Sequence, residues 1–264
     1  MNVVSLAASA LAPGVSPVPI RYREEGAGPP IVLLHGGWGY AIYPFDRQIA
    51  ALAPAHRLVA ADRTGYGGSG RLERQETDFH RRAALETLAL LDALGIERAV
   101  WWGHSDGAVI ALLAALEAPD RVRGVIAEAA HFDRAKPRSR DFFETMRDRP
   151  EGLGERVVAV LEADHGPAWQ RIIRMNGDAW LRLGAQGGDL YDGRLPTIRV
   201  PVLVLHGARD PRTEPGELDR LTASLGTAGS TIVLPEGAHS PHHERATADD
   251  VTRLAAGWLA SLPS

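Results

Sequence analysis

The sequence of 264 residues contains no cysteine. This excludes disulfide bonds, thiolate metal sites and a cysteine nucleophile, and it is compatible with the cytosol. No stretch reaches the roughly 18 uninterrupted apolar residues that a membrane-spanning helix needs. Residues 1–12 are mildly apolar but carry no Lys or Arg ahead of the apolar stretch, so we expect no secretion signal. We therefore expect a soluble, cytoplasmic protein with no membrane partner.

Basic residues are not gathered in any one segment. The 29 Lys and Arg are interspersed with 33 Asp and Glu, and the formal net charge of −4 argues against nucleic acid as the main partner. No zinc-like spacing is present, and the glycines of residues 65–70 fit neither the phosphate-loop nor the dinucleotide-binding pattern. We expect no metal and no cofactor, and a small molecule as the partner of a monomer or homodimer.

Short apolar runs bounded by Gly or polar residues are typical of buried strands. They cover residues 31–34, 57–61, 99–102, 124–127, 201–205 and 231–234. Helical patterns lie between them, for example at residues 79–94 and 108–116. This alternation predicts an α/β fold, with a mostly parallel central sheet flanked by helices on both faces.

The alternation is interrupted between about residues 133 and 196. Two polar helical segments here carry large apolar side chains: Phe142, Phe143, Met146, Trp169, Met175 and Trp180. Such side chains either cover the mouth of a pocket or simply anchor the helices to the core. We predict a small helical lid, 134–196, inserted into a core domain formed by 1–133 and 197–264, and we place Trp169 and Trp180 among the substrate-binding residues.

The sharpest motif is Gly103-His104-Ser105-Asp106-Gly107, which lies directly between the predicted strand 99–102 and the predicted helix 108–116. A strained turn at this place lifts the serine hydroxyl clear of the sheet, and its glycines avoid collisions with neighbouring backbone. A serine hydroxyl is a poor nucleophile by itself, so it requires a base and a carboxylate that orients the base.

Two loops after later strands supply these groups. Asp210 follows the strand 201–205 and His239 follows the strand 231–234, and the carboxyl ends of parallel strands meet at one edge of a sheet. Asp133 competes with Asp210 for the carboxylate role. His242 and His243 compete with His239, but we expect both to be solvent-exposed residues at a helix start.

Further motifs, His35-Gly36-Gly37-Trp38 and the glycine-rich turn at residues 62–69, complete a resemblance to the α/β-hydrolase superfamily from about Pro19 onward. The resemblance implies a catalytic triad of Ser105, Asp210 and His239, in the chain order that this family uses. It also implies an oxyanion hole formed by the backbone N–H groups of Gly37 and Asp106. We add Trp38 to the substrate-binding residues.

The segment around Ser105 and His239 also resembles, more weakly, the valacyclovir-hydrolase-like esterases, which cleave amino-acid esters. In that case the Asp106 carboxylate binds the ammonium group of the substrate, whereas the plain alternative is that it caps the helix that follows. Glu128 and Asp133, after the fourth predicted strand, are candidates for further negative charge in the pocket.

Other eye-catching residues are expected to be structural. His35, His104 and His206 each lie beside a strand end. We expect each to be a packed, hydrogen-bonded core histidine rather than a metal ligand. Trp101 and Trp102 are expected to pack within their strand.

The sequence thus predicts a serine hydrolase that cleaves a small or medium carboxylic ester through an acyl-enzyme. The alternatives are a C–C bond or lactone hydrolase with the same triad, and a non-catalytic or biosynthetic small-molecule-binding member of the fold.

Overall fold

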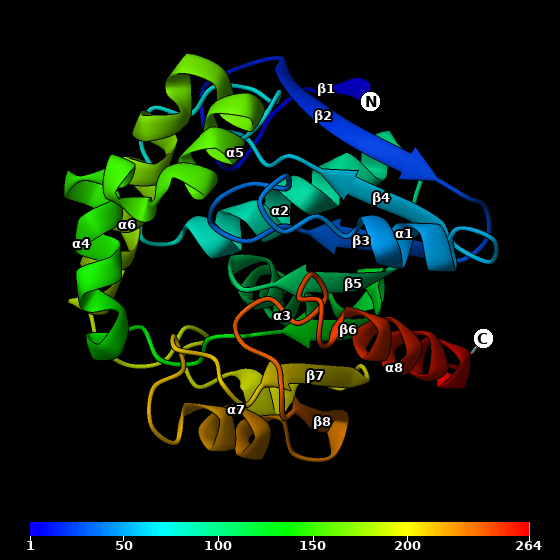
Figure 1. The fold of residues 1–264 in the computed structure, drawn as a ribbon. Helices are drawn as coiled ribbons and strands as arrows, with labels where there is room; N and C mark the ends of the chain where they lie inside the picture. Colours follow the sequence, from blue (N-terminus) through cyan, green and yellow to red (C-terminus); the bar gives the residue numbers. More distant parts are fainter. Residues whose placement is uncertain (264) are drawn as a thin grey trace.

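The computed structural model describes residues 1–263, which build one eight-stranded sheet with the strand order β1-β2-β4-β3-β5-β6-β7-β8 (Figure 1). The pairs β1–β2 and β2–β4 are antiparallel, and all later pairs are parallel. The strands are β1 (Asn2–Leu6), β2 (Val18–Glu25), β3 (Pro30–Leu34), β4 (Arg57–Ala61), β5 (Ala99–His104), β6 (Val122–Glu128), β7 (Val202–Gly207) and β8 (Gly229–Leu234). The predicted α/β fold with a mostly parallel sheet is therefore confirmed.

Helices flank this sheet and connect its strands. The α-helices are α1 (Asp46–Leu52), α2 (Phe79–Ala93), α3 (Asp106–Glu117), α4 (Arg140–Asp148), α5 (Glu155–His165), α6 (Trp169–Gly184), α7 (Glu217–Leu225) and α8 (Ala248–Ser261). Short 3₁₀ helices cover Pro119–Arg121, Pro137–Ser139, Pro150–Leu153, Gly166–Ala168, Leu195–Thr197 and Gly226–Ala228. Among residues 1–263, no helix combines the length and the apolar character that crossing a membrane requires.

The six predicted strands are all present, but β1 and β2 were missed. These two strands form one side of the sheet, where β1 is the edge and is largely exposed. β2 is only partly buried and carries charged side chains at four of its eight positions. A strand of this kind lacks the continuous apolar run by which a central parallel strand is recognised.

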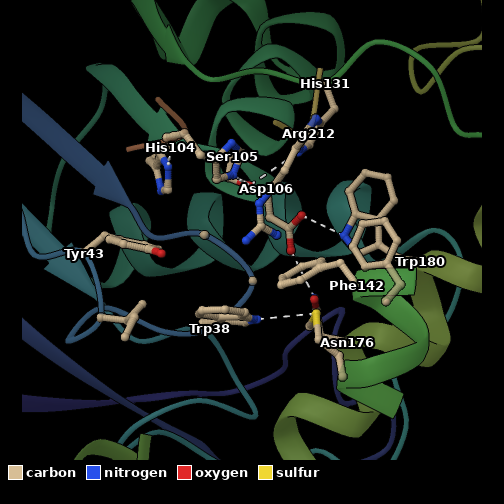
Figure 2. Close-up of a pocket in the computed structure, with 16 residues that line it drawn as sticks. Trp38, Tyr43, His104, Ser105, Asp106, His131, Phe142, Asn176, Trp180 and Arg212 are labelled. Carbon is tan, nitrogen blue, oxygen red and sulfur yellow. Dashed lines mark hydrogen bonds between the residues drawn. The ribbon is translucent and has the colours of Figure 1, made fainter. Parts of the chain in front are cut away.

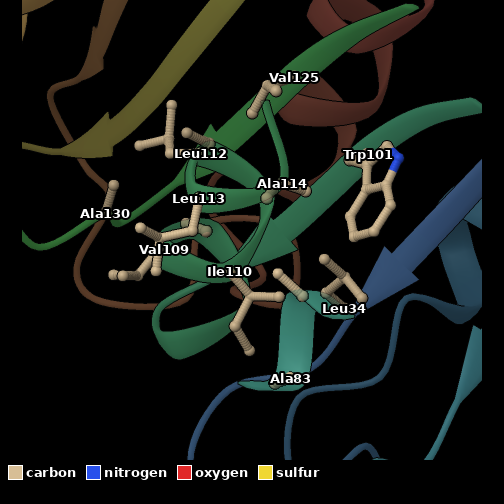
Figure 3. Packing of buried hydrophobic residues seen from close by; sticks show 14 of the residues in the cluster. Leu34, Ala83, Trp101, Val109, Ile110, Leu112, Leu113, Ala114, Val125 and Ala130 are labelled. Carbon is tan, nitrogen blue, oxygen red and sulfur yellow. The ribbon is translucent and has the colours of Figure 1, made fainter. Parts of the chain in front are cut away.

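The central strands are buried on both faces, and successive side chains point to opposite cores. Trp101 of β5 belongs to a core cluster with apolar residues of α2 and α3. Figure 3 shows Trp101 together with the α3 residues of this cluster. The next residue, Trp102, packs on the other face with residues of α1 and α8, such as Ile49 and Val251. Both tryptophans are fully buried, as expected for strand packing.

Helices α4, α5 and α6 lie between β6 and β7 in the chain and gather at one end of the strands (Figure 1). They belong to the segment predicted as a lid. The loops that follow β3, β5, β6, β7 and β8 lie at this same end of the sheet. Together with α4 and α6 they supply most of the site residues described below.

Candidate active site

Three side chains from separate loops form a continuous hydrogen-bonded chain. The Ser105 hydroxyl lies 3.1 Å from His239 Nε2, and His239 Nδ1 lies 2.9 Å from Asp210 Oδ2. All three residues are buried. The structure thus brings together the three residues that the sequence assigns to a triad, with the base in direct contact with both the hydroxyl and the carboxylate.

Ser105 sits in a strained turn between β5 and α3. Its backbone φ of 55° lies in the left-handed region, which a residue with a side chain rarely adopts. A Cβ atom at Gly103 would lie 1.9 Å from the Gly107 carbonyl oxygen, and one at Gly107 would lie 2.1 Å from the Leu34 carbonyl oxygen. Both positions therefore require glycine. Helix α3 starts at Asp106, two residues earlier than predicted, so the serine stands directly at its first turn.

The protonation of the histidine–carboxylate pair follows from its surroundings. Burial by itself raises the pKa of Asp210, but the charge and hydrogen bond of His239 and the Arg212 backbone N–H bring it down to about 2. Burial lowers the pKa of His239 more than the neighbouring carboxylate raises it. At neutral pH the site therefore holds an ionised Asp210 and a neutral His239, which has Nε2 free to accept a proton.

The two backbone amides assigned to an oxyanion hole lie beside the serine. Neither the Gly37 nor the Asp106 N–H donates a hydrogen bond to another group within residues 1–263. A Cβ atom at Gly37 would lie 2.7 Å from Asn176 Oδ1 and 2.9 Å from Asp106 Oδ2, so this loop residue has no room for a side chain.

The carboxylate of Asp106 is 1% exposed and is held by three side-chain donors. His80 Nε2 lies 3.2 Å from Oδ1, Trp180 Nε1 lies 3.0 Å from Oδ1, and Asn176 Nδ2 lies 3.1 Å from Oδ2. Burial raises its pKa, but the hydrogen bond and charge of His80, the Arg63 charge and the Asn176 hydrogen bond outweigh burial and lower the pKa to about 2. The carboxylate makes no capping hydrogen bond to α3, contrary to the plain alternative, although its charge lies in the first helical turn.

A cavity opens beside Ser105, with about 420 Å³ of empty space when the part open to solvent is included (Figure 2). Its lining residues come from the loops, from the end of β5 and the start of α3, and from α4 and α6: Gly36, Gly37, Trp38, Ile42, Tyr43, His104, Ser105, Asp106, His131, Phe142, Phe143, Met146, Asn176, Trp180, Arg212 and His239. Trp38 and Trp180, two of the predicted substrate-binding residues, line it. Trp169 does not, because it is buried at the start of α6 among apolar core residues.

The prediction of an exposed His242 was wrong. Its side chain is 0% exposed, and its Nδ1 donates a 2.6 Å hydrogen bond to Glu128 while its Nε2 donates to the Tyr43 carbonyl oxygen. The charge of Glu128 raises the pKa of His242 against the effect of burial. His243 is exposed, as expected.

Glu128 and Asp133 do not add negative charge to the cavity. Glu128 is occupied by His242 and by the Trp102 indole N–H, on the other side of β6 from the cavity. Asp133 forms an ion pair with Arg220 and does not approach His239, so it is not the triad carboxylate.

The three strand-end histidines are buried and hydrogen-bonded, as expected. His35 donates from Nδ1 to the Gly36 carbonyl oxygen at 2.7 Å, and His104 donates from Nε2 to the His239 carbonyl oxygen at 2.8 Å. His206 Nε2 lies 2.7 Å from the Thr213 hydroxyl. His104 also lines the cavity. Its hydrogen bond to the His239 backbone holds the loop that carries His239 in place.

Sequence reasoning missed five cavity residues: Ile42, Tyr43, His131, Asn176 and Arg212. His131 follows β6, and its Nε2 lies 3.5 Å from Ser105 Oγ. Arg212 comes two residues after Asp210, and this closeness to the predicted triad carboxylate could have marked it as a site residue. Asn176 lies on α6, where nothing in the local sequence marks a site residue.

Comparisons with known proteins agree with this architecture. The family model for the alpha/beta hydrolase fold matches residues 29–169, more than half of the chain. The chain is 38% identical over 197 residues to epoxide hydrolase A of Mycobacterium tuberculosis, a match that covers 68% of this chain and 60% of that protein. It therefore spans less than two thirds of the length of that relative.

A second relative is matched over most of both chains. The serine hydrolase BPHL of Mus musculus is 30% identical over 254 residues, or 93% of this chain and 84% of BPHL. The weaker resemblance to valacyclovir-hydrolase-like esterases is consistent with this match. Among solved structures, a meta-cleavage product hydrolase from Pseudomonas fluorescens IP01 has a TM-score of 0.76 at 22% identity, with 97% of each chain covered. The chain therefore belongs to the α/β-hydrolase fold family and is a hydrolase.

Proposed function

We propose that the protein is a serine hydrolase that cleaves carboxylic esters of small or medium size through an acyl-enzyme. The observation that carries the proposal is the hydrogen-bonded chain from Ser105 Oγ to His239 and on to Asp210, at 3.1 and 2.9 Å, in the wall of a cavity. An alcohol group in direct contact with an oriented imidazole is the arrangement that nucleophilic catalysis by serine requires.

In the first step, neutral His239 accepts the Ser105 proton at Nε2 while Oγ attacks the carbonyl carbon of the ester. The carbonyl oxygen becomes negatively charged and receives hydrogen bonds from the backbone N–H groups of Gly37 and Asp106. In other hydrolases, removal of one such donor raises the activation free energy by about 3–4 kcal/mol. The ionised Asp210 stabilises the imidazolium that forms.

In the second step, the imidazolium returns its proton to the leaving alcohol, and the acyl group stays on Ser105. A water molecule then attacks this acyl-enzyme while His239 again accepts the proton at Nε2. Collapse of the second tetrahedral intermediate releases the carboxylic acid and restores the serine hydroxyl.

The identity of the nucleophile favours acyl substrates. Attack of a serine oxygen on an epoxide or a haloalkane would leave an alkyl ether on Ser105, and an ether has no carbonyl carbon for the second attack by water. Attack on an ester leaves a new ester, which the same base-assisted step cleaves. We therefore propose ester cleavage although two relatives are named epoxide hydrolases.

The cavity supports a substrate of limited size. Apolar side chains provide much of its lining: Trp38, Ile42, Phe142, Phe143 and Met146. A short or medium acyl chain would pack against these side chains, and burial of each CH₂ group contributes about 0.8 kcal/mol.

A fluorophosphonate probe tests the proposal, because it labels an activated serine. We expect labelling of the wild-type protein and of Ser261→Ala, which removes an exposed serine of α8, but not of Ser105→Ala. A panel of 4-nitrophenyl esters, lactones and dienones then separates ester, lactone and C–C bond cleavage. An unlabelled wild-type protein would indicate a non-catalytic member of the fold, and turnover of dienones alone would replace ester cleavage by C–C bond cleavage.

A further inference from the structure

The Arg212 side chain forms part of the cavity wall (Figure 2). Its guanidinium carbon lies 3.6 Å from the centre of the Phe142 ring and 5.5 Å from the centre of the Trp38 ring. Both rings line the same cavity. Stacking on aromatic rings orients the planar guanidinium and leaves its N–H groups free, because the contact is made through the face of the group.

These N–H groups have no partner in the part of the chain that the structure describes, residues 1–263. The side chain of Arg212 forms no hydrogen bond and no ion pair there, although its backbone N–H donates to Asp210 at 2.9 Å. The carboxylates that face it act from further away and are already engaged. Asp210 binds His239, and Asp106 accepts its three side-chain donors.

Two buried cations near the cavity are fully engaged. Arg63 donates to the carbonyl oxygens of His35 and Gly36. Lys136 forms a buried ion pair with Glu217, and both of these side chains are almost completely inaccessible to solvent. Arg212 therefore differs from both in offering unused donors to the cavity.

We propose that Arg212 binds a carboxylate group of the substrate, so that the preferred substrates are half-esters of dicarboxylic acids. This inference rests on the proposed ester hydrolysis. A guanidinium presents parallel N–H donors that match the two oxygens of a carboxylate, and such charge-assisted pairs are stronger than neutral hydrogen bonds. The free carboxylate would lie against Arg212 while the ester carbonyl lies at Ser105 Oγ.

The state of Asp106 points in the same direction. An ammonium group recognised by Asp106 would compete with three hydrogen-bond donors that already surround this carboxylate. The unused charge in the cavity is therefore positive, and a substrate anion complements it better than a substrate cation.

The test compares mono-4-nitrophenyl esters of succinic, glutaric and adipic acid with the same esters after the free acid is capped as a methyl ester. We expect the wild-type kcat/KM to be higher for the free acid in at least one pair. We expect this free-to-capped ratio to fall about 10- to 100-fold in Arg212→Gln, because a hydrogen-bonded charge pair is lost. The matched control is Arg209→Gln, an exposed arginine paired with Glu236 at the surface, which should keep the wild-type ratio.

Binding separates this inference from the proposed function. The half-esters are titrated calorimetrically into Ser105→Ala and into Ser105→Ala/Arg212→Gln, where no turnover is needed. A 10- to 100-fold weaker affinity in the double variant supports carboxylate binding even if the wild-type protein hydrolyses no ester, a result that would refute only the proposed function. Equal affinities, or a free-to-capped ratio that does not change in Arg212→Gln, would overturn the inference while leaving ester hydrolysis intact.

Discussion

Replacing Asp106 by Asn tests how strongly the buried carboxylate is held by its surroundings. Its pKa lies at about 2 in the folded protein, compared with an ordinary value of 3.8. By linkage, this difference corresponds to about 2 kcal/mol of folding free energy at neutral pH. An asparagine has nearly the same shape but no charge, so the substitution removes this contribution while the side-chain volume stays constant.

The stability difference between Asp106→Asn and wild type should depend on pH. The folded-state pKa is lowered, so the contribution is fully present above the ordinary pKa of the carboxyl group and is lost as the pH falls towards about 2. We expect Asp106→Asn to be about 2 kcal/mol less stable than wild type at pH 7, and the deficit to fall to roughly half by pH 3. At pH 7 the melting temperature should drop by about 4–8 °C.

Urea unfolding at pH 7 and pH 3 measures both quantities. Trp180→Phe is the companion variant, since it keeps an aromatic ring and removes the N–H donor that lies 3.0 Å from Asp106 Oδ1. It should be less stable than wild type by about 1–3 kcal/mol, and its effect should shrink in the Asp106→Asn background. Equal stability of Asp106→Asn and wild type at pH 7, or a deficit that does not change with pH, would refute the reasoning.

Three further predictions concern the triad and the core. Asp210→Asn should lower kcat for a 4-nitrophenyl ester by about 10⁴-fold because the imidazole loses its orienting carboxylate, and a loss below tenfold would contradict this role. Burial lowers the pKa of His239, so the acid limb of a kcat/KM–pH profile should have its midpoint below 6.5; a midpoint above that value would argue against His239 as the base. Glu128→Gln should cost about 3–5 kcal/mol in unfolding experiments at pH 6, because it leaves the His242 imidazolium buried without its charge partner. The pKa of His242 is raised, so this cost should decline as the pH rises through that pKa, and a constant cost from pH 6 to pH 9 would count against the charge pair.

The triad residues that sequence reasoning located share one property, which is their position in the turn or loop that follows a predicted strand. Ser105 directly follows the buried strand β5, Asp210 follows the buried strand β7, and His239 follows the partly exposed edge strand β8; the topology of a parallel sheet brings these strand ends to one edge whatever the loops contain. Strand order and chain position therefore suffice to gather these side chains.

The misplaced and overlooked residues depend on packing between distant segments. His242 is buried because Glu128, 114 positions earlier in the chain, accepts its hydrogen bond. Asn176 enters the site because one face of α6 meets the turn at Ser105. Neither contact can be predicted from the local sequence, because both depend on how helices and loops pack against the folded sheet.

The attachment of α6 to the Ser105 turn has a consequence for how molecules enter. Asn176 and Trp180, one helical turn apart, both hold the Asp106 carboxylate, and Gly177 lies between them against the backbone of α4. Tilting this pair of helices outward would leave an inaccessible anion without two of its donors, at about 1–3 kcal/mol for each. Outward movement of the two helices therefore carries a free-energy cost that any molecule too large for the cavity would have to offset.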